Sequence, residues 1–156
     1  MNRLSTLLPL ANILVEAEAR DKSAALDCTA ALFAASTDIA RERIRASLDA
    51  REAMGSTGLG QGVAIPHGRI RGLRQACAAV IRLARPLEFG APDSQPVSLL
   101  FALLVPENAS QEHLELLSEL AQMLSDRALR EALHTQADAA SVLARITAWA
   151  PAGRAA

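Results

Sequence analysis

A histidine behind a glycine-rich loop carries the clearest chemistry in this sequence. Five of the eight glycines lie between residues 55 and 69. Glycine tolerates positive φ and lets a ligand approach the backbone, so such a loop can bind an anion through its N–H groups. A short, β-prone run over 63–65 follows, and Pro66 suits the end of a strand. The pattern predicts that His67 lies just past a strand, at an exposed end, beside an anion-binding loop.

Two further side chains have the chemistry to assist such a histidine. His113 starts an apolar stripe continued by Leu117, Leu120 and Leu124, so we expect it to face inward in the first turn of a helix. There the positive end of the helix dipole favours a neutral ring that can donate one hydrogen bond. Arg51 lies where a predicted helix opens into the glycine loop, and a guanidinium can hold phosphoryl oxygens in a bidentate way. Its plainer interpretation is a cation at a helix C-terminus.

The loop and its surroundings resemble the active-site signature of the type 2 EIIA domains of the bacterial phosphotransferase system. The resemblance rests on residues 55–60 (GSTGLG) and 64–68 (AIPHG). It continues through Arg51-Glu52 upstream and through residues 99–106 and His113-Leu114 downstream, so it covers nearly the whole chain. The sequence of residues 54–58 (MGSTG) is most similar to that of the nitrogen-regulatory branch of this family.

The resemblance implies a phosphocarrier in which His67 accepts a phosphoryl group on its Nε2 atom from the small histidine-containing carrier protein. It also implies supporting roles for His113 and Arg51. The residues it implies for phosphate binding are Ser56, Thr57, Gly58, Gly60 and Arg69. Arg69 stands where a lysine is common in the family, which keeps the charge but changes the hydrogen-bond geometry.

The resemblance leaves the downstream partner open. A nitrogen-regulatory protein would control target proteins, such as potassium transporters or sensor kinases, through its phosphorylation state. A sugar-specific EIIA would instead pass the phosphoryl group to the EIIB domain of a fructose- or mannitol-type transporter. Either role is transferase-like chemistry without a cofactor.

The composition argues against several other classes of protein. Hydrophobic residues make up 51% of the 156 residues and charged residues 21%, as in an ordinary globular domain. Aromatic residues make up only 3% and the net charge is −1. Base stacking and phosphate-backbone binding usually need aromatic side chains and a basic excess, so nucleic-acid binding is not expected. No run approaches the ~18 apolar residues of a membrane span, so we expect no membrane insertion.

Metal, nucleotide and redox sites are also disfavoured. The three histidines are far apart and lack the close pairing typical of zinc sites, so no metal is expected. The glycine loop is not GxxxxGK[ST] and contains no lysine. Cys28 and Cys77 have no CxxC spacing and are interpreted as buried thiols of a reducing cytoplasm. Residues 3–19 superficially resemble a signal peptide, but polar residues interrupt the apolar region, so a cytoplasmic location is expected.

Hydrophobic periodicity predicts an alternation of strands and helices along the chain. The predicted strands cover residues 12–16, 63–65, 76–83 and 97–105. The predicted helices cover 23–35, a segment capped by Thr37 or Asp38, a segment beginning near Asn108 or Ser110, 126–133 and 138–149. The order is strand, two helices, three strands, three helices, which favours helices around a small mixed sheet. The family resemblance implies the same three-layer α/β/α sandwich. We expect one domain over residues 1–150 and a tail over 151–156.

Overall fold

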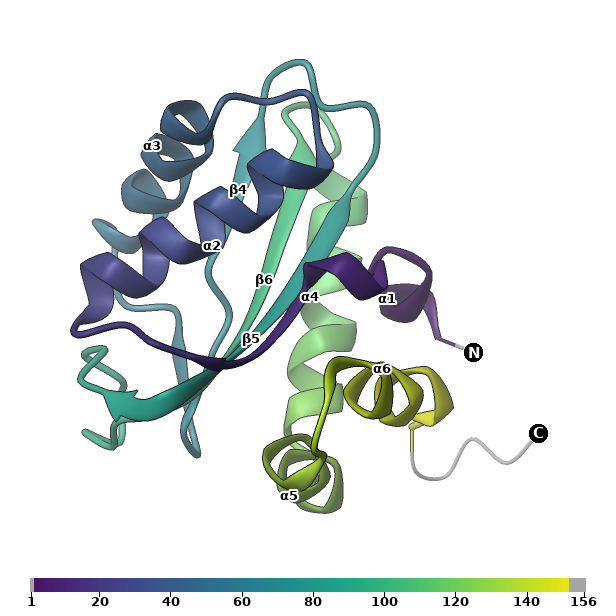
Figure 1. Ribbon diagram of the computed structural model, residues 1–156. Coiled ribbons are helices and arrows are strands. Elements are labelled where there is room, and N and C mark those ends of the chain that lie inside the picture. Colours follow the sequence, from purple (N-terminus) through teal and green to yellow (C-terminus); the bar gives the residue numbers. More distant parts are fainter. Residues whose placement is uncertain (1, 152–156) are drawn as a thin grey trace.

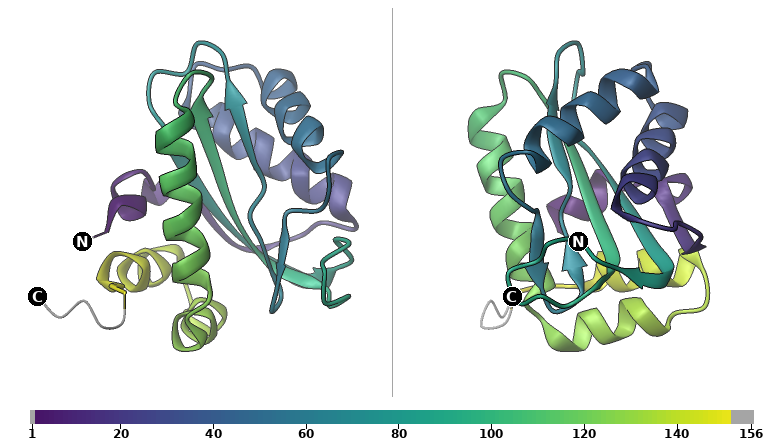
Figure 2. Two further views of the ribbon diagram at one scale, coloured as in Figure 1. Left: turned by 180° about the vertical axis from the view of Figure 1, so that it is seen from behind. Right: turned by 90° about the vertical axis from the view of Figure 1, so that its left-hand side faces the viewer.

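A mixed β-sheet lies between two layers of helices in the computed structural model, which describes residues 2–151 (Figure 1). In chain order the elements are α1 (Arg3–Thr6), the 3-10 helix η1 (Leu10–Asn12), β1 (Ile13–Ala17), α2 (Lys22–Ser36), α3 (Arg41–Glu52), β2 (Gly58–Gly60), β3 (Val63–Ala64), β4 (His67–Ile70), β5 (Cys77–Leu87), β6 (Val97–Pro106), α4 (Ser110–Leu124), α5 (Arg127–Thr135) and α6 (Ala139–Ala148). Helices α2 and α3 cover one face of the sheet, while α1, α4, α5 and α6 lie on the other (Figure 2). This arrangement confirms the predicted three-layer sandwich.

The long elements follow the predicted order, and the structure adds several short ones. Helix α1, the 3-10 helix η1 and the strands β2 and β4 have no counterpart among the predicted elements. Each of these additions spans only three or four residues, too few for a periodic signal to develop. The division into a domain and a tail stays a prediction, because nearly all of the tail lies outside the described residues. No helix in residues 2–151 combines the length and apolar character needed to cross a bilayer.

Strand β6 is the centre of the sheet. It pairs antiparallel with β5 on one side, and β5 pairs parallel with β1 at that edge. On its other side β6 pairs in parallel first with β3, where Val63 lies opposite Leu99, and then with β4, where His67 lies opposite Leu103. β2 is antiparallel to β3. The nearly continuous apolar run of β6 is typical of a strand covered on both faces, and this strand sets the position of His67.

Pro66 lies between β3 and β4 but does not interrupt the hydrogen bonding of this segment to β6. Pro66 has no N–H, but its carbonyl accepts a hydrogen bond of 3.0 Å from the N–H of Leu103. His67 lies just past β3, as predicted, but the expectation of an exposed position was wrong. His67 is the first residue of β4, and only 7% of its surface is exposed. Arg69 occupies an outward position of the same strand.

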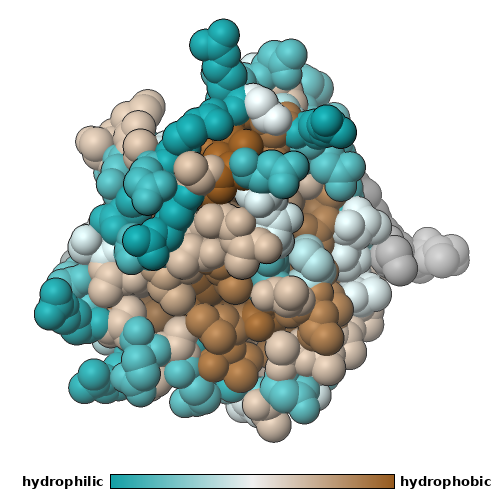
Figure 3. Space-filling view, turned by 45° about the horizontal axis from the view of Figure 1, so that its top comes forward, coloured by the Kyte–Doolittle hydropathy of each residue, from teal (hydrophilic) through white to brown (hydrophobic). Residues whose placement is uncertain are grey.

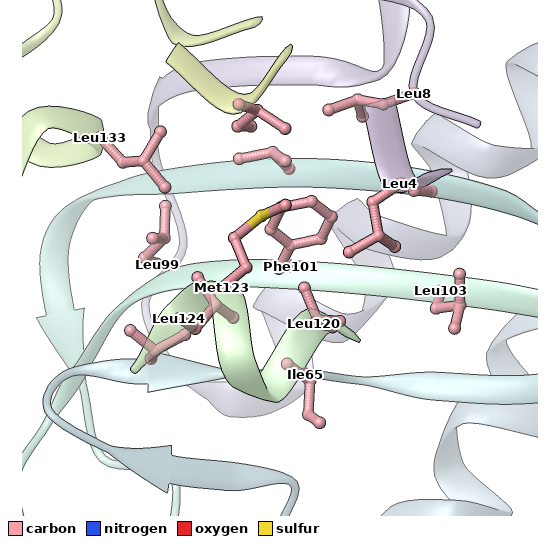
Figure 4. Packing of buried hydrophobic residues seen from close by; sticks show 14 of the residues in the cluster. Leu4, Leu8, Ile65, Leu99, Phe101, Leu103, Leu120, Met123, Leu124 and Leu133 are labelled. Atoms are coloured by element: carbon pink, nitrogen blue, oxygen red, sulfur yellow. The ribbon is translucent and has the colours of Figure 1, made fainter. Parts of the chain in front are cut away.

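The core lies on both faces of the sheet. One cluster packs the sheet against α4 and its neighbours, and Figure 4 shows side chains of β6, such as Phe101, beside Leu120 and Met123 of α4. On the other face, Phe33 of α2 and Ile44 and Leu48 of α3 are fully buried. These contacts hold α3 and α4, the two helices that carry Arg51 and His113, against opposite faces of the sheet.

Helix capping shows where local sequence signals succeeded. Asp126 and Asp138 accept hydrogen bonds from backbone N–H groups of the first turns of α5 and α6, as predicted. The predicted cap of α3 by Thr37 or Asp38 was wrong, because this helix begins after Ala40, whose side chain cannot cap. Helix α4 begins at Ser110, as predicted, but its N-cap position is held by Ala109, which cannot cap either. Tertiary packing of their apolar faces therefore outweighs the missing caps.

The surface of the protein is mixed in polarity. Figure 3 shows one face, on which hydrophilic side chains project along the upper rim and apolar ones gather near the centre. The exposed large apolar side chains are Leu10, Leu14, Met54, Leu59 and Leu114. Met54 is 83% exposed, and it lies just after Ala53, the C-cap of α3.

Candidate active site

His67 is held by the backbone of its own segment. Its Nδ1 lies 2.7 Å from the carbonyl oxygen of Ile65. A carbonyl only accepts, so Nδ1 carries the proton and Nε2 has the free lone pair of a neutral ring. Burial lowers the pKa of His67, the hydrogen bond to Ile65 opposes that shift, and the charge of Arg51 adds to the lowering. The ring is therefore a neutral nucleophile near pH 7.

His113 lies beside His67. The two ring centroids are 5.3 Å apart, and the ring planes meet edge to face at 68°. Only 8% of the surface of His113 is exposed, which confirms the inward position predicted from the apolar stripe of α4. Burial is the largest cause of a lowered pKa at His113, followed by the charges of His67, Arg69 and Arg51.

A pocket of about 450 Å³ opens over the two histidines. Its lining residues come from α3 and the turn after it, from β4 and from α4: Ser47, Ala50, Arg51, Met54, His67, Gly68, Arg69 and His113. The pocket thus combines one free imidazole nitrogen with two guanidinium groups. Such a combination suits a nucleophile that receives a dianionic group.

The two arginines of the pocket are held differently. Arg51 Nη1 donates a hydrogen bond of 2.7 Å to the carbonyl oxygen of Gly55, which joins the end of α3 to the start of the glycine loop. Arg69 Nε donates a hydrogen bond of 3.2 Å to Nδ1 of His113. Both predicted arginines therefore lie at the pocket, together with both predicted histidines.

The four loop residues predicted to bind phosphate do not line this pocket. Ser56 donates a hydrogen bond of 2.7 Å to the carbonyl oxygen of Phe89 and accepts one of 3.0 Å from the N–H of Gly58. Gly58 lies so close to Ala91 that a Cβ atom would fall 2.8 Å from the Cβ of Ala91. These contacts brace the loop against the segment after β5, so the geometry favours a supporting role.

Thr57 and Gly60 also make contacts away from the pocket. The hydroxyl and the N–H of Thr57 both donate to the carboxylate of Glu52. Gly60 has a φ of +89° and lies against the carboxylate of Asp93, which accepts a hydrogen bond of 2.9 Å from the N–H of Gln61. The positive φ explains the glycine at this position without reference to a ligand.

Sequence reasoning missed the buried carboxylate next to Arg51. The side chain of Glu52 is 7% exposed and forms an ion pair of 2.8 Å with Lys22 at the start of α2. Lys22 also donates to the carbonyl oxygen of Phe89 and lies over its ring, 4.6 Å from the centroid. Glu52 thus links α3, α2 and the loop. The adjacent Arg51-Glu52 pair at a helix end was the available signal, but an acidic residue there usually faces solvent.

His134 lies outside the pocket. Its Nε2 is 2.8 Å from the hydroxyl of Ser98, and its Nδ1 is 2.8 Å from the carbonyl oxygen of Arg130. Within residues 2–151, no three His, Cys, Asp or Glu side chains are grouped so that they could hold a metal ion.

Comparison with known proteins assigns this chain to a family. The model of the family described as "Phosphoenolpyruvate-dependent sugar phosphotransferase system, EIIA 2" matches residues 6–149. This chain is a member of the type 2 EIIA family. The predicted family resemblance is thereby confirmed, and the matched range contains every residue of the pocket.

Individual EIIA proteins show which branches of the family are similar. A "Nitrogen regulatory protein" of Pseudomonas aeruginosa is 42% identical over 136 residues, which cover 86% of this chain and 88% of the relative. A "PTS system fructose-specific EIIA component" of Haloferax volcanii is 35% identical over 134 residues, covering 83% and 85%. The crystal structure of nitrogen regulatory protein IIA-Ntr from Neisseria meningitidis superposes with a TM-score of 0.88 at 45% identity, covering 93% of this chain and 99% of that one.

Proposed function

We propose that this chain is a phosphocarrier and regulatory protein of the nitrogen branch of the phosphotransferase system. In this proposal His67 accepts a phosphoryl group on Nε2 from the histidine-containing carrier protein. The observation that carries the proposal is the hydrogen bond between Nδ1 of His67 and the carbonyl oxygen of Ile65, because it leaves Nε2 as the nucleophile in a cationic pocket.

The transfer needs little covalent chemistry from the protein. The lone pair of Nε2 attacks phosphorus, the new N–P bond forms, and the P–N bond of the donor phosphohistidine breaks with its electron pair returning to the donor ring. Positive charge then grows on the ring of His67, and the carbonyl of Ile65 stabilises it by accepting from Nδ1–H. Arg51, Arg69 and His113 face the phosphoryl oxygens, so catalysis is mainly positioning and electrostatic stabilisation.

The regulatory part of the proposal follows from charge. A phosphoryl group adds nearly two negative charges to a pocket that holds two arginines. A target protein that binds this face meets a different potential in the two states, and a potassium transporter or a sensor kinase is the kind of target expected. The identities of the relatives from Pseudomonas and Neisseria support this branch, and a cytoplasmic location is part of the proposal.

The second candidate function is a sugar-specific EIIA that passes the phosphoryl group to an EIIB domain. The fructose-specific EIIA relative from Haloferax favours it, because it matches over 83% of this chain. Both functions share the acceptor histidine and differ only in what consumes the phosphoryl group. Incubating the phosphorylated protein with purified fructose- and mannitol-type EIIB domains separates them, since rapid loss of phosphate to EIIB would replace the regulatory proposal.

Incubation with phosphoenolpyruvate, enzyme I and the carrier protein tests the shared chemistry. We expect one acid-labile, base-stable phosphate per chain, and none in His67→Ala. A phosphate that survives acid, or one that hydroxylamine removes, would place the acceptor on a hydroxyl or a carboxylate and overturn the mechanism.

Quench-flow rates test the supporting residues. His113→Ala and Arg51→Ala should still be labelled, at rates lowered by ~10²–10³, as is typical for the loss of one preorganised donor. Arg51→Lys should recover part of the rate, because an ammonium lacks the planar fork. His134→Ala is the matched control, since His134 lies outside the pocket, and its rate should equal that of the wild type.

Regulation is tested by binding rather than by labelling. Pull-downs with His67→Ala, His67→Glu and phosphorylated wild type should recover different partners or different affinities. If all three bind the same partners with the same affinities, the regulatory part of the proposal is wrong and the protein only relays phosphoryl groups.

A further inference from the structure

We propose that Arg69 is a positioning residue that acts through His113, by holding it in the tautomer whose Nε2–H is free to bind a phosphoryl oxygen. The proposal deepens the proposed function, because it assigns the state of the second histidine before the phosphoryl group arrives. It also gives this chain a reason to use arginine at position 69.

The tautomer follows from the direction of one hydrogen bond. Arg69 Nε lies 3.2 Å from Nδ1 of His113 with the geometry of a donated bond. A guanidinium has five N–H donors and no acceptor, so Nδ1 must offer a lone pair. A neutral imidazole with a lone pair on Nδ1 carries its proton on Nε2. The contact is therefore incompatible with the Nδ1–H tautomer and with the doubly protonated ring.

The remaining nitrogen of His113 is prepared for an acceptor. Nε2 is buried and has no hydrogen-bond partner within residues 2–151. Buried donors of folded proteins are nearly always paired, so a lone one beside a nucleophile indicates a group that is satisfied at another stage. The ring lies edge to face with His67, at a centroid distance of 5.3 Å. A phosphoryl oxygen on His67 Nε2 would provide the missing acceptor.

The charges around His113 act in the same direction. Facing it are His67 and Arg69 from β4 and Arg51 from α3, while Glu112 precedes it on its own helix. Glu112 is paired with Arg3 at 3.4 Å. A proton on Nδ1 would point at a guanidinium. After burial, the charges of these neighbouring groups contribute to the lowered pKa of His113.

Arginine can do this while keeping other donors free. Only Nε of Arg69 is used in the contact with His113, and no other hydrogen bond of its side chain is formed to the described residues. The two Nη groups therefore remain available to phosphoryl oxygens, as the sequence predicted for this residue. A lysine has a single nitrogen, which would have to serve both the hydrogen bond to His113 and the contact with phosphoryl oxygens, and it lacks the planar, forked geometry of a guanidinium.

The decisive measurement is the ring nitrogen spectrum of His113. Two-bond ¹H–¹⁵N correlation at pH 7.5 on the unphosphorylated, full-length protein should show Nε2 as protonated and Nδ1 as a hydrogen-bonded acceptor. In Arg69→Met the Nδ1 resonance should shift toward that of a free imidazole, and the Nδ1–H tautomer should become detectable. Arg71→Met, an exposed arginine just past β4, is the matched control and should leave the spectrum unchanged. An Nδ1–H tautomer in the wild type, or an unchanged spectrum in Arg69→Met, overturns the proposal.

Transfer rates provide an independent readout. Arg69→Met should lower the rate of phosphotransfer from the carrier by about tenfold or more, less than the loss expected for His113→Ala. In a His113→Ala background the part of this effect that acts through His113 should vanish, so the loss in the double variant should be smaller than the two single losses combined. A full, additive loss would mean that Arg69 acts on the phosphoryl group alone, and the positioning role would be wrong. If the wild type fails to accept phosphate, the proposed function is overturned. The tautomer of His113 would still be decided by its ¹⁵N spectrum, which does not depend on phosphotransfer.

Discussion

Gly68 of β4 lies directly against Ser47 of α3. A Cβ atom at Gly68 would overlap the hydroxyl of Ser47 and come within 3.1 Å of its Cβ. The hydroxyl of Ser47 also donates a hydrogen bond of 3.0 Å to the carbonyl oxygen of Arg69. Glycine at this position therefore lets the helix that carries Arg51 approach the strand that carries His67 and Arg69.

Gly68→Ala should separate α3 from β4. We expect a loss of about 1–3 kcal/mol in the free energy of unfolding, as for overpacked cores, measured by urea denaturation. Phosphotransfer should slow as well, because Arg51 moves with its helix. Ser47→Ala removes the worst overlap, so the double variant should be less destabilised than the sum of the single variants. Strict additivity would contradict the proposed contact.

The parts of the site that depend on sequence motifs could be predicted, and those that depend on strand pairing could not. A glycine loop, an apolar stripe and a helix end mark the positions of His67, His113 and Arg51, and the family resemblance supplied their roles. The contact between Arg69 and His113 requires β4 to be a strand, and its four residues are too short to show an alternation. No strand was therefore predicted over residues 67–70, and the contact between Arg69 and His113 could not be foreseen.

In the glycine loop, the sequence predicted phosphate-binding residues that the structure does not place at the pocket. Its composition is typical of an anion site, yet the hydroxyls of Ser56 and Thr57 bind Phe89 and Glu52. Sequence cannot distinguish a loop that binds a ligand from one that is braced by its own protein, because both need small residues and free backbone geometry. The three-layer architecture, in contrast, followed from long elements whose patterns extend over many residues.

Glu52→Ala should destabilise the protein. Glu52 is a buried acceptor for Thr57 and for the ammonium of Lys22, and hydrogen bonds to charged groups contribute about 1.5–3 kcal/mol. Because the side chain of Lys22 is 30% exposed, solvent can partly replace the lost partner, and we expect the lower end of this range. Glu131→Ala is the control, since its pair with Arg127 is exposed on both sides and should change stability by less than about 0.5 kcal/mol. Equal urea midpoints for both variants would refute the role of Glu52.

Ser56→Ala separates a bracing loop from a phosphate-binding one. If the hydroxyl only joins Phe89 to Gly58, its removal should cost about 1 kcal/mol in unfolding free energy and leave the rate of phosphotransfer within a few-fold of the wild type. A rate loss of ~10² with unchanged stability would show that the hydroxyl contacts the phosphoryl group. Quench-flow and urea denaturation on one preparation provide both numbers.

Stability should fall as the solution is acidified through the histidine range. The pKa values of His67 and His113 are both lowered from the ordinary value of 6.5, with burial as the largest cause. Below about pH 6.5 the unfolded chain therefore binds protons that the folded chain still resists. Because the unfolded state then holds more protons, the free energy of unfolding decreases as pH falls from 6.5 toward the folded pKa values, and it is independent of these groups above that window.

The pH dependence can be assigned by substitution. Urea denaturation between pH 7.5 and 5 should show the decrease in the wild type and a smaller one in His67→Gln and His113→Gln, because a neutral amide of similar size does not titrate. The range stays above the pKa values of Asp93, Glu115 and Asp138, which their hydrogen bonds hold below the usual carboxylate values and which would destabilise the fold only at lower pH. If stability instead rises on acidification, or if neither histidine variant flattens the curve, the two pocket histidines are not buried as neutral rings.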